Sequence, residues 1–398
     1  MRLIWFWLAG IAAGSDPHWV ATWSASMAGS AANPPIFSNQ TVREIVHTTV
    51  GGSSVRVRFS NAFGNQPLVI GAGHVAVCAL GSIIRPSTDR ALRFNGQLST
   101  SIPRGKFVLS DPVGLNLTPL QDLAVSIYLA AATSATSVHW SARQTSYVAD
   151  GDRTGSSVMW PNDTIASWPF LAGVEVAGGE AEGAIVALGD SITDGAASAM
   201  DSNRRWPNVL AERLLGQNRR PLAVVNAGIG GNRILHDGAG PSGPEFGASA
   251  LGRFDRDVLA QPGVKYVIVL EGINDLGHPG VAAPFSETVS ATEIISGLQI
   301  LIARAHEKGI RIFGGTLLPF EGATAPGHFT PEREVSRQSV NQWIRTSKAF
   351  DAVIDFDKAV RDPSHPARML LRYDSGDHVH PSDAGYKAMG ETVDLSLF

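Results

Sequence analysis

Five short apolar segments in the C-terminal half of this 398-residue chain alternate with longer segments of helical periodicity. The apolar segments are Ala184–Leu188, Ala223–Asn226, Tyr266–Leu270, Ile310–Thr316 and Ala352–Phe356. The helical segments are expected near Trp206–Leu215, Ala248–Leu259, Ser286–Lys308, Pro331–Phe350 and Ser382–Val393. Strands that alternate with helices in this way form parallel sheets with right-handed crossovers. The pattern therefore predicts an α/β domain with three α/β/α layers.

The N-terminal part of the chain has a different pattern, in which short strand-like segments are separated by turns and no long helical period intervenes. Apolar and polar residues alternate in Val55–Phe59, and Gly51-Gly52 before them predicts a hairpin turn from Glu44–Val50. Further candidate strands are Leu68–Ile70, His74–Ala79, Lys106–Leu109, Leu123–Leu129 and Val138–Ala142. We therefore expect an all-β sandwich of jelly-roll-like topology before the α/β domain.

Composition shifts predict the domain boundaries. The stretch 173–183 is rich in Gly, Ala and Glu, which is typical of a junction between domains. We expect a β-sandwich domain over residues 16–175, a linker over 176–183 and the α/β domain over 184–398. Arg2 followed by the apolar run Leu3–Ala13 predicts a signal peptide over residues 1–15, and this run is too short to span a bilayer. The expected location is therefore secreted or periplasmic.

Charge and residue usage exclude several classes of function. The net charge is −4 and there is no long basic run, so we expect no nucleic-acid partner. A single cysteine, Cys78, excludes an internal disulfide. The chain has no His-Glu-x-x-His motif and no Walker loop, and His236, His278 and His328 are scattered in sequence. We therefore expect no metal and no cofactor, and the oligomeric state stays open.

Polar blocks follow the first three strands of the predicted parallel sheet. Gly189-Asp190-Ser191-Ile192-Thr193 closes the first strand, Asn226–Asn232 the second and Gly272–Asp275 the third. The carboxyl ends of parallel strands meet at one edge of the sheet, where ligands bind. Ser191 at that edge is a candidate nucleophile if a base can reach it, whereas its alternative role is to cap a helix.

A candidate base lies near the C-terminus in the segment Asp377-His378-Val379-His380. His380 can accept the Ser191 proton through one ring nitrogen if Asp377 holds the other nitrogen and fixes the tautomer. His378 is the alternative base, but Asp377 is adjacent to it and poorly placed to support it.

The three polar blocks and the segment Asp377–His380, in this order, resemble the conserved blocks of the SGNH hydrolases, also called GDSL esterases. The resemblance covers about Ala184 to the C-terminus. It implies a catalytic triad, an oxyanion hole and one structural aspartate near the site. The triad would be Ser191, Asp377 and His380; the hole Ser191, Gly231 and Asn274; the structural residue Asp190. The part before Ala184 is similar, less specifically, to the β-rich N-terminal domain of some esterases of this family, among them carbohydrate esterases.

The resemblance implies a serine esterase that acts through an acyl-serine intermediate and takes an ester substrate. It favours O-acetyl esters of carbohydrates, as in acetylxylan esterases, with an acetylated polysaccharide as the expected partner. The alternatives are a short-chain lipase, arylesterase or thioesterase of the same family, and a catalytically inactive carbohydrate-binding protein.

Five N-terminal tryptophans can stack on sugars or belong to the protein core. They are Trp19, Trp23, Trp140, Trp160 and Trp168. We expect the sandwich to form one wall of the substrate cleft and to supply an aromatic side chain such as Trp140 or Trp160.

Overall fold

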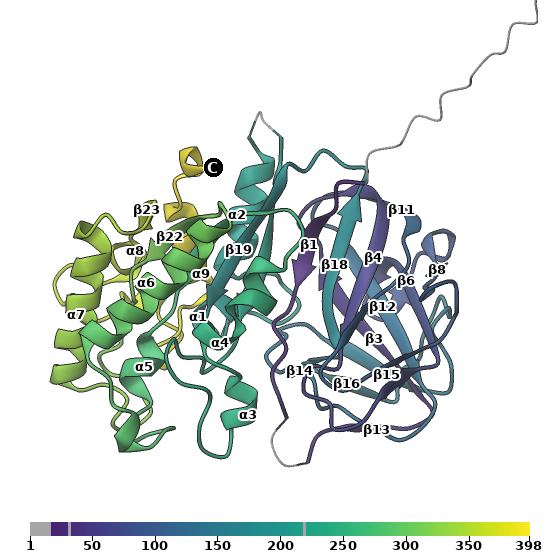
Figure 1. The fold of residues 1–398 in the computed structure, drawn as a ribbon, viewed down its shortest axis with the longest axis horizontal. Helices are drawn as coiled ribbons and strands as arrows, with labels where there is room; N and C mark the ends of the chain where they lie inside the picture. Colours follow the sequence, from purple (N-terminus) through teal and green to yellow (C-terminus); the bar gives the residue numbers. More distant parts are fainter. Residues whose placement is uncertain (1–16, 31–32, 218–219) are drawn as a thin grey trace, which may run out of the picture.

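The computed structural model describes residues 17–30, 33–217 and 220–398. The expected signal peptide lies outside these residues. The described residues form a β-sandwich and an α/β region that lie side by side (Figure 1). None of the helices in these residues is long and apolar enough to cross a membrane.

The α/β region is built on one parallel sheet with strand order β20-β19-β21-β22-β23. The strands are β19 (Gly183–Gly189), β20 (Leu222–Gly228), β21 (Val264–Leu270), β22 (Arg311–Gly315) and β23 (Ala352–Ile354). Since β19 lies between β20 and β21, the winding of the chain reverses there, and ligands of such sheets bind at this reversal. The predicted three-layer parallel-sheet architecture is confirmed.

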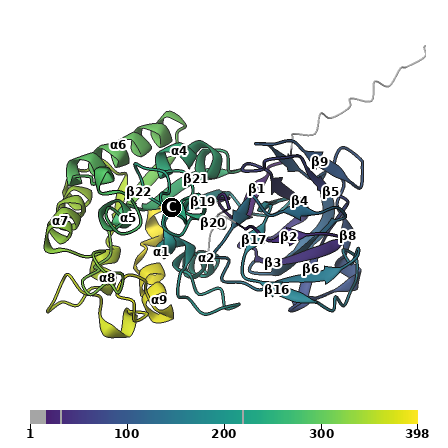
Figure 2. The ribbon, with the colours of Figure 1, turned by 90° about the horizontal axis from the view of Figure 1, so that it is seen from below.

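Helices cover both faces of this sheet, with α2, α8 and α9 on one side and α4, α6 and α7 on the other (Figure 2). The α-helices are α1 (Ser191–Asp194), α2 (Trp206–Leu215), α3 (Gly243–Phe246), α4 (Ala250–Phe254), α5 (Ile273–Gly277), α6 (Ala291–Glu307), α7 (Pro331–Thr346), α8 (Phe356–Val360) and α9 (Asp383–Thr392). A π-helical turn, η2 (Asp255–Leu259), continues α4. Short 3-10 turns are η1 (Pro86–Thr88), η3 (Phe285–Glu287), η4 (Leu371–Tyr373) and η5 (Leu395–Leu397).

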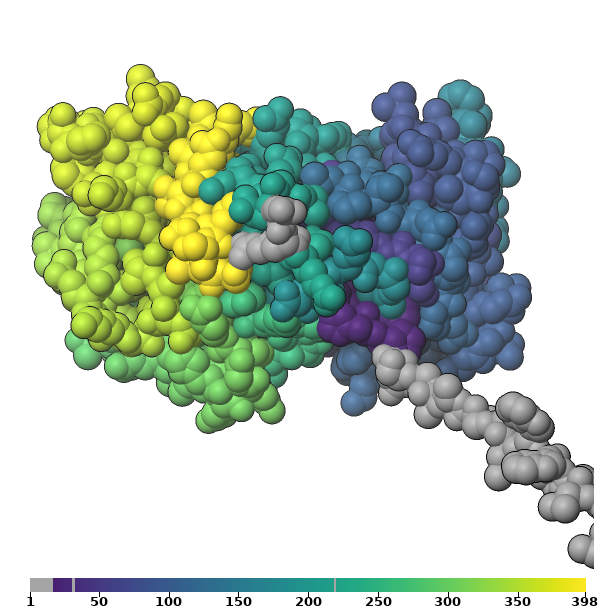
Figure 3. All heavy atoms as spheres, turned by 90° about the horizontal axis from the view of Figure 1, so that it is seen from above, coloured from purple at the N-terminus to yellow at the C-terminus, as the bar shows by residue number. Residues whose placement is uncertain are grey.

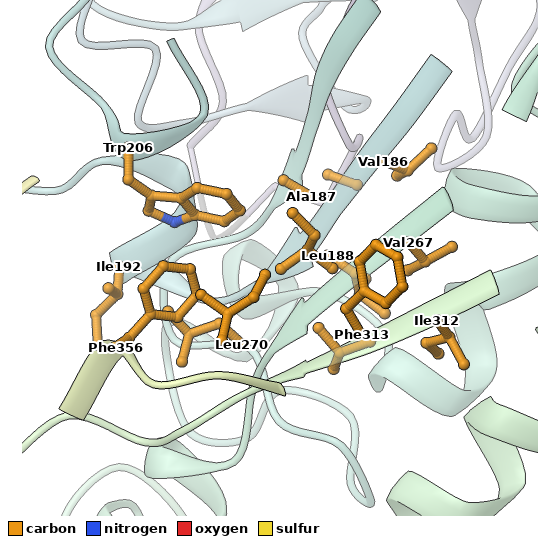
Figure 4. Close-up of a cluster of buried hydrophobic side chains, with 14 of the residues drawn as sticks. Val186, Ala187, Leu188, Ile192, Trp206, Val267, Leu270, Ile312, Phe313 and Phe356 are labelled. Carbon is orange, nitrogen blue, oxygen red and sulfur yellow. The ribbon is translucent and has the colours of Figure 1, made fainter. Parts of the chain in front are cut away.

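Apolar side chains fill the space between the sheet and its helices (Figure 4). The rings of Trp206 and Phe356 lie 5.2 Å apart, and both residues are fully buried. The helix expected from Ser286 begins only at Ala291, because Ser290 and Glu293 form a reciprocal capping box that fixes its first turn.

The sandwich consists of two antiparallel sheets that enclose a second apolar core. One sheet has the order β1-β18-β4-β10, with β11 paired to β4; the other has the order β16-β15-β3-β12-β6-β7, with β8 paired to β6. The first contains β1 (Val20–Ser24), β4 (Gly52–Ser60), β10 (Phe107–Leu109), β11 (Val113–Leu117) and β18 (Leu171–Ala177). The second contains β3 (Gln40–His47), β6 (Ala72–Leu80), β7 (Ile83–Ile84), β8 (Arg90–Ala91), β12 (Asp122–Leu129), β15 (Ser146–Asp150) and β16 (Asp163–Ile165).

Three short pairs complete this region. They are β2 (Ile36–Phe37) with β13 (Thr133–Ser134), β5 (Leu68–Ile70) with β9 (Thr100–Ile102), and β14 (Val138–His139) with β17 (Trp168–Pro169).

The hairpin predicted at Gly51-Gly52 is wrong, because β3 and β4 belong to different sheets. β3 pairs with β12 and β15, whereas β4 pairs with β18, β10 and β11. Val46 of β3 and Val55 of β4 are both fully buried in the core between the sheets. The chain therefore crosses from one layer to the other at the glycines, so that both apolar faces are covered.

The sandwich and the α/β region pack directly against each other, and their atoms touch at the surface seen in Figure 3. The glycine-rich connection is shorter than expected, because 173–177 complete β18 and only 178–182 join it to β19. Ser24 Oγ donates a hydrogen bond to the Asn226 carbonyl at 2.9 Å, and the Val224 N–H donates to Thr49 Oγ1 at 3.2 Å. The second strand of the parallel sheet is thus anchored directly to the sandwich.

Candidate active site

Ser191 is the first residue of α1, immediately beyond the carboxyl end of β19. The Asp190 side chain caps this helix, since its Oδ1 accepts a hydrogen bond from the Ile192 N–H at 2.9 Å. A Cβ at Gly189 would lie 2.2 Å from Thr193 Oγ1, so only glycine permits this tight turn from strand to helix. The turn leaves Ser191 half-buried at the edge of the sheet, with its hydroxyl able to reach a partner.

The structure brings Ser191, His380 and Asp377 into one hydrogen-bonded chain. Ser191 Oγ lies 2.7 Å from His380 Nε2, and His380 Nδ1 lies 2.6 Å from Asp377 Oδ2. The N–H groups of Val379 and His380 donate to Asp377 Oδ1 at 2.9 and 2.8 Å. Burial opposes ionisation of this carboxyl, but the hydrogen bonds and the charge of His380 hold the Asp377 pKa well below its usual range. An ionised Asp377 fixes the His380 tautomer that leaves Nε2 free to accept a proton.

His378 is held in a separate pair. Its Nδ1 lies 2.6 Å from Asp374 Oδ2, and its backbone is left-handed, with φ at 62°. His378 and His380 thus pair with different aspartates, Asp374 and Asp377. The alternative base therefore has a partner of its own, and His380 is the histidine that contacts Ser191.

Three hydrogen-bond donors follow the ends of the neighbouring strands β19, β20 and β21. Among the described residues, neither the Ser191 N–H nor the Gly231 N–H has an acceptor. Asn274 is buried, and its Nδ2 uses one hydrogen to bind the Asn232 carbonyl at 2.9 Å, which leaves the second hydrogen for a ligand. Gly231 has φ at 74°, and a Cβ there would lie 2.2 Å from Phe246 Cδ1. Only glycine fits this position, and unpaired donors here are suited to a developing negative charge.

Buried acids lie beneath these loops. Asp275 accepts hydrogen bonds from the N–H groups of Ile234 and Leu235 at 2.7 and 3.0 Å, and burial nevertheless raises its pKa to about 6. Burial also raises the pKa of Asp190 and of Glu271, whose two oxygens have no hydrogen-bond partner among the described residues. Asp190 and Asp275 therefore both accept hydrogen bonds from backbone N–H groups of the site loops.

Arg253 is a site residue that the sequence pattern did not indicate. Its side chain is fully buried and donates to the carbonyls of Gly189 and Ala227 at 2.9 and 2.6 Å, and to Asn232 Oδ1 at 2.8 Å. It also donates to Ser26 Oγ of the sandwich at 3.3 Å. One cation thus joins the ends of β19 and β20 to the loop that carries Gly231. A single arginine within a predicted helix gives no sequence signal for such a role.

Two of the scattered histidines meet in the fold. The rings of His278 and His328 lie 5.9 Å apart, and burial lowers their pKa values to about 3 and about 4. In the part of the chain that the structure describes, no three His, Cys, Asp or Glu side chains are grouped so that they could hold a metal ion.

Several known proteins are similar to part of this chain. The profile of the GDSL-like lipase/acylhydrolase family matches residues 187–388, just over half of the chain. No curated protein matches the chain. A GDSL-like lipase from Bacteroides thetaiotaomicron is 18% identical, with 54% of this chain and 88% of that chain covered and a TM-score of 0.39. A catalytic mutant of an acetylxylan esterase from Geobacillus stearothermophilus is 21% identical, with 53% and 92% covered and a TM-score of 0.39.

Proposed function

Because this chain belongs to the GDSL-like lipase/acylhydrolase family of hydrolases, we propose that it hydrolyses carboxylic esters with Ser191 as the nucleophile. We further propose that its preferred substrates are O-acetyl esters of carbohydrates. The observation that carries the first proposal is the continuous chain from Ser191 Oγ through His380 to Asp377, with distances of 2.7 and 2.6 Å.

In the acylation step, His380 Nε2 accepts the Ser191 hydroxyl proton while Oγ attacks the ester carbonyl carbon. The carbonyl π electrons move onto oxygen to form the oxyanion. This intermediate then collapses, the bond to the alcohol breaks, and His380 gives its proton to the leaving alkoxide. Water attacks the acyl-Ser191 ester by the same route, and the acid and free Ser191 are released.

The N–H groups of Ser191 and Gly231 and the Asn274 amide would hydrogen-bond the oxyanion. Each such donor can lower the barrier by about 2.7–4 kcal/mol, because it interacts most strongly once charge develops. Asp377 stabilises the imidazolium that forms on His380 and holds the ring in place. Arg253 and Asn274 keep the Gly231 loop in position through Asn232.

The exposure of the triad supports a bulky alcohol as part of the substrate. The side chains of His380 and Asp377 are 23% and 37% exposed, so the site lies at the surface rather than at the end of a tunnel. An acetyl group on a polysaccharide can reach such a site while the rest of the polymer stays in solvent. The resemblance to SGNH esterases also favours this substrate class over long acyl chains.

The proposal is tested with an organophosphonate and p-nitrophenyl acetate. The phosphonate should label Ser191, as mapped by peptide mass spectrometry, and the wild-type protein should hydrolyse the aryl ester. Ser191→Ala should lose the label and most of the activity. A label on another serine with Ser191 free would contradict the assignment. A folded protein that neither reacts nor hydrolyses would favour an inactive carbohydrate-binding protein.

Acetylated xylan, acetylated pectin and aryl esters of increasing acyl length then test the substrate class. We expect the highest kcat/KM for an acetylated carbohydrate. A preference for longer aryl or thiol esters would instead favour the lipase, arylesterase or thioesterase alternatives.

A further inference from the structure

A cavity of about 140 Å³ lies between the sandwich and the α/β region. His139, Trp140 and Ser141 line it from the sandwich side, and Gly230, Glu245 and Phe246 from the other side. Its volume is far larger than the roughly 10–15 Å³ that a cavity needs to hold one water molecule. The cavity can therefore admit part of a substrate.

The cavity is lined by residues that belong to the same short helix and loop as Ser191 and Gly231. Gly230 directly precedes Gly231, and the Phe246 ring lies where a side chain at Gly231 would be. Asp194, which also lines the cavity, is the last residue of the short helix that begins at Ser191. A group in this cavity would thus lie beside the nucleophile helix and the oxyanion loop.

The two walls are held at a fixed separation by a buried pair. His139 Nε2 of the sandwich lies 2.9 Å from Asp194 Oδ1, and the two side chains are 5% and 3% exposed. Arg205 Nε donates to the Asp194 carbonyl at 2.6 Å. Because these contacts lie within the protein itself, they fix the cavity wall, and little binding free energy is spent on ordering it.

The lining combines aromatic rings with polar groups. Trp140 is half-buried, and its Nε1–H donates to the Gly29 carbonyl at 2.7 Å, which fixes the orientation of the indole. Phe246 is a second aromatic wall. Ser141 and Glu245 are partly exposed, and Glu245 has no ion-pair partner among the described residues.

This lining suits a sugar ring better than an alkyl chain. A sugar presents C–H faces to aromatic rings and hydroxyls to a carboxylate and a serine. An alkyl chain would bury Glu245 and Ser141 without hydrogen bonds, which is unfavourable.

We propose that this cavity is a sugar subsite for the alcohol part of the ester, with Trp140 of the sandwich as its platform. The inference rests on the proposed function and assigns a substrate-binding role to the N-terminal region. Trp140 and Glu245 act here on substrate choice, whereas the triad performs the bond-making steps.

The test compares kcat/KM on acetylated xylo-oligosaccharides with kcat/KM on p-nitrophenyl acetate. In Trp140→Ala, the oligosaccharide-to-aryl-ester ratio should fall about tenfold, which corresponds to the loss of about one aromatic contact. Trp140→Phe keeps a ring and should recover part of the ratio. Trp160→Ala is the matched control, because Trp160 is 84% exposed in the same region and does not line the cavity; its ratio should match that of the wild type.

An unchanged ratio in both Trp140 variants would overturn the subsite. So would a Trp140→Ala enzyme that loses both activities equally, or one that gains activity on longer acyl chains. If the wild type hydrolyses the aryl ester but neither hydrolyses nor is inhibited by the oligosaccharide, the subsite fails while the esterase assignment stands.

If the protein does not hydrolyse esters through Ser191, calorimetry still tests whether the subsite binds sugar. Acetylated xylo-oligosaccharide should bind Ser191→Ala about tenfold more tightly than it binds Ser191→Ala/Trp140→Ala. Equal affinities, or no binding to either protein, would refute the subsite independently of catalysis.

Discussion

Ser191 Oγ lies 2.7 Å from His380 Nε2 although 189 positions separate the two residues in the chain. Ser191 follows β19, the first strand of the parallel sheet, and His380 lies on the loop before α9, the last α-helix. The fold therefore brings the first and last parts of the α/β region together at one edge of the sheet.

The two neighbouring histidines should differ sharply in their effect on activity. His380→Ala removes the group that contacts Ser191 and should lower kcat by roughly 10⁴-fold or more. His378→Ala removes a ring paired with Asp374 and should retain most of the activity. Steady-state kinetics on p-nitrophenyl acetate measure both. Comparable losses in two well-folded variants would contradict the assignment of His380 as the base.

Asn274→Ala should lower kcat by roughly 10²–10³ and change KM little, because the amide interacts most strongly with the oxyanion. Asn116→Ala, which changes an exposed asparagine of the sandwich, serves as the control. A normal kcat in Asn274→Ala would remove this residue from the mechanism.

Arg253→Met should destabilise the protein by about 3–5 kcal/mol, because it removes the cation that pairs with the buried carboxylates of Asp257 and Glu271. It also leaves two backbone carbonyls and one side-chain amide oxygen without this donor. Denaturant unfolding measures this change. Arg304→Met is the matched control, since Arg304 pairs with an Asp255 side chain that is 76% exposed, and its ion pair should contribute at most about 1 kcal/mol. Similar losses in the two variants would argue against a central role for Arg253.

Asp275 should make the stability of the protein depend on pH. Its pKa is about 6 in the folded protein, above the ordinary value of 3.8, so the folded state keeps the proton longer than the unfolded state. The resulting stabilisation is complete below about pH 4 and is lost as the pH rises through about 6. The amide side chain in Asp275→Asn does not ionise, so this variant lacks the pH-dependent contribution.

The difference in unfolding free energy between wild type and Asp275→Asn should therefore shrink by about 3 kcal/mol from pH 4 to pH 7. Unfolding in urea at several pH values measures it, with the exposed Asp163→Asn as a control for general charge effects. A difference that stays constant or grows with pH would show that the Asp275 pKa is not raised.

Much of the α/β region is predictable because its signals are local. Each of the five strands is a short apolar segment, and each turn after the first three carries polar residues. The alternation of strands and helices favours a parallel sheet, whose carboxyl edge then collects Ser191, Gly231 and Asn274. The spacing in Asp377-His378-Val379-His380 similarly indicates that Asp377 can pair with His380, because two residues three positions apart on one loop lie close together.

The sandwich was less predictable, because antiparallel pairing depends on distant partners. Gly51-Gly52 has the local pattern of a hairpin, yet the chain crosses between two sheets there because Val46 and Val55 both face the shared core. Likewise, residues 173–177 have the composition of a linker but pair with β4 as a strand.

The sequence alone determined the strand–helix alternation and the residue types at each strand end, because these depend on side chains a few positions apart. Only the tertiary structure decided that Arg253 joins two strand ends to the Gly231 loop, that His139 pairs with Asp194 across the interface, and that Trp140 rather than Trp160 lines a cavity beside the site. These contacts join residues tens to hundreds of positions apart, and which of them form depends on how the two regions pack against each other.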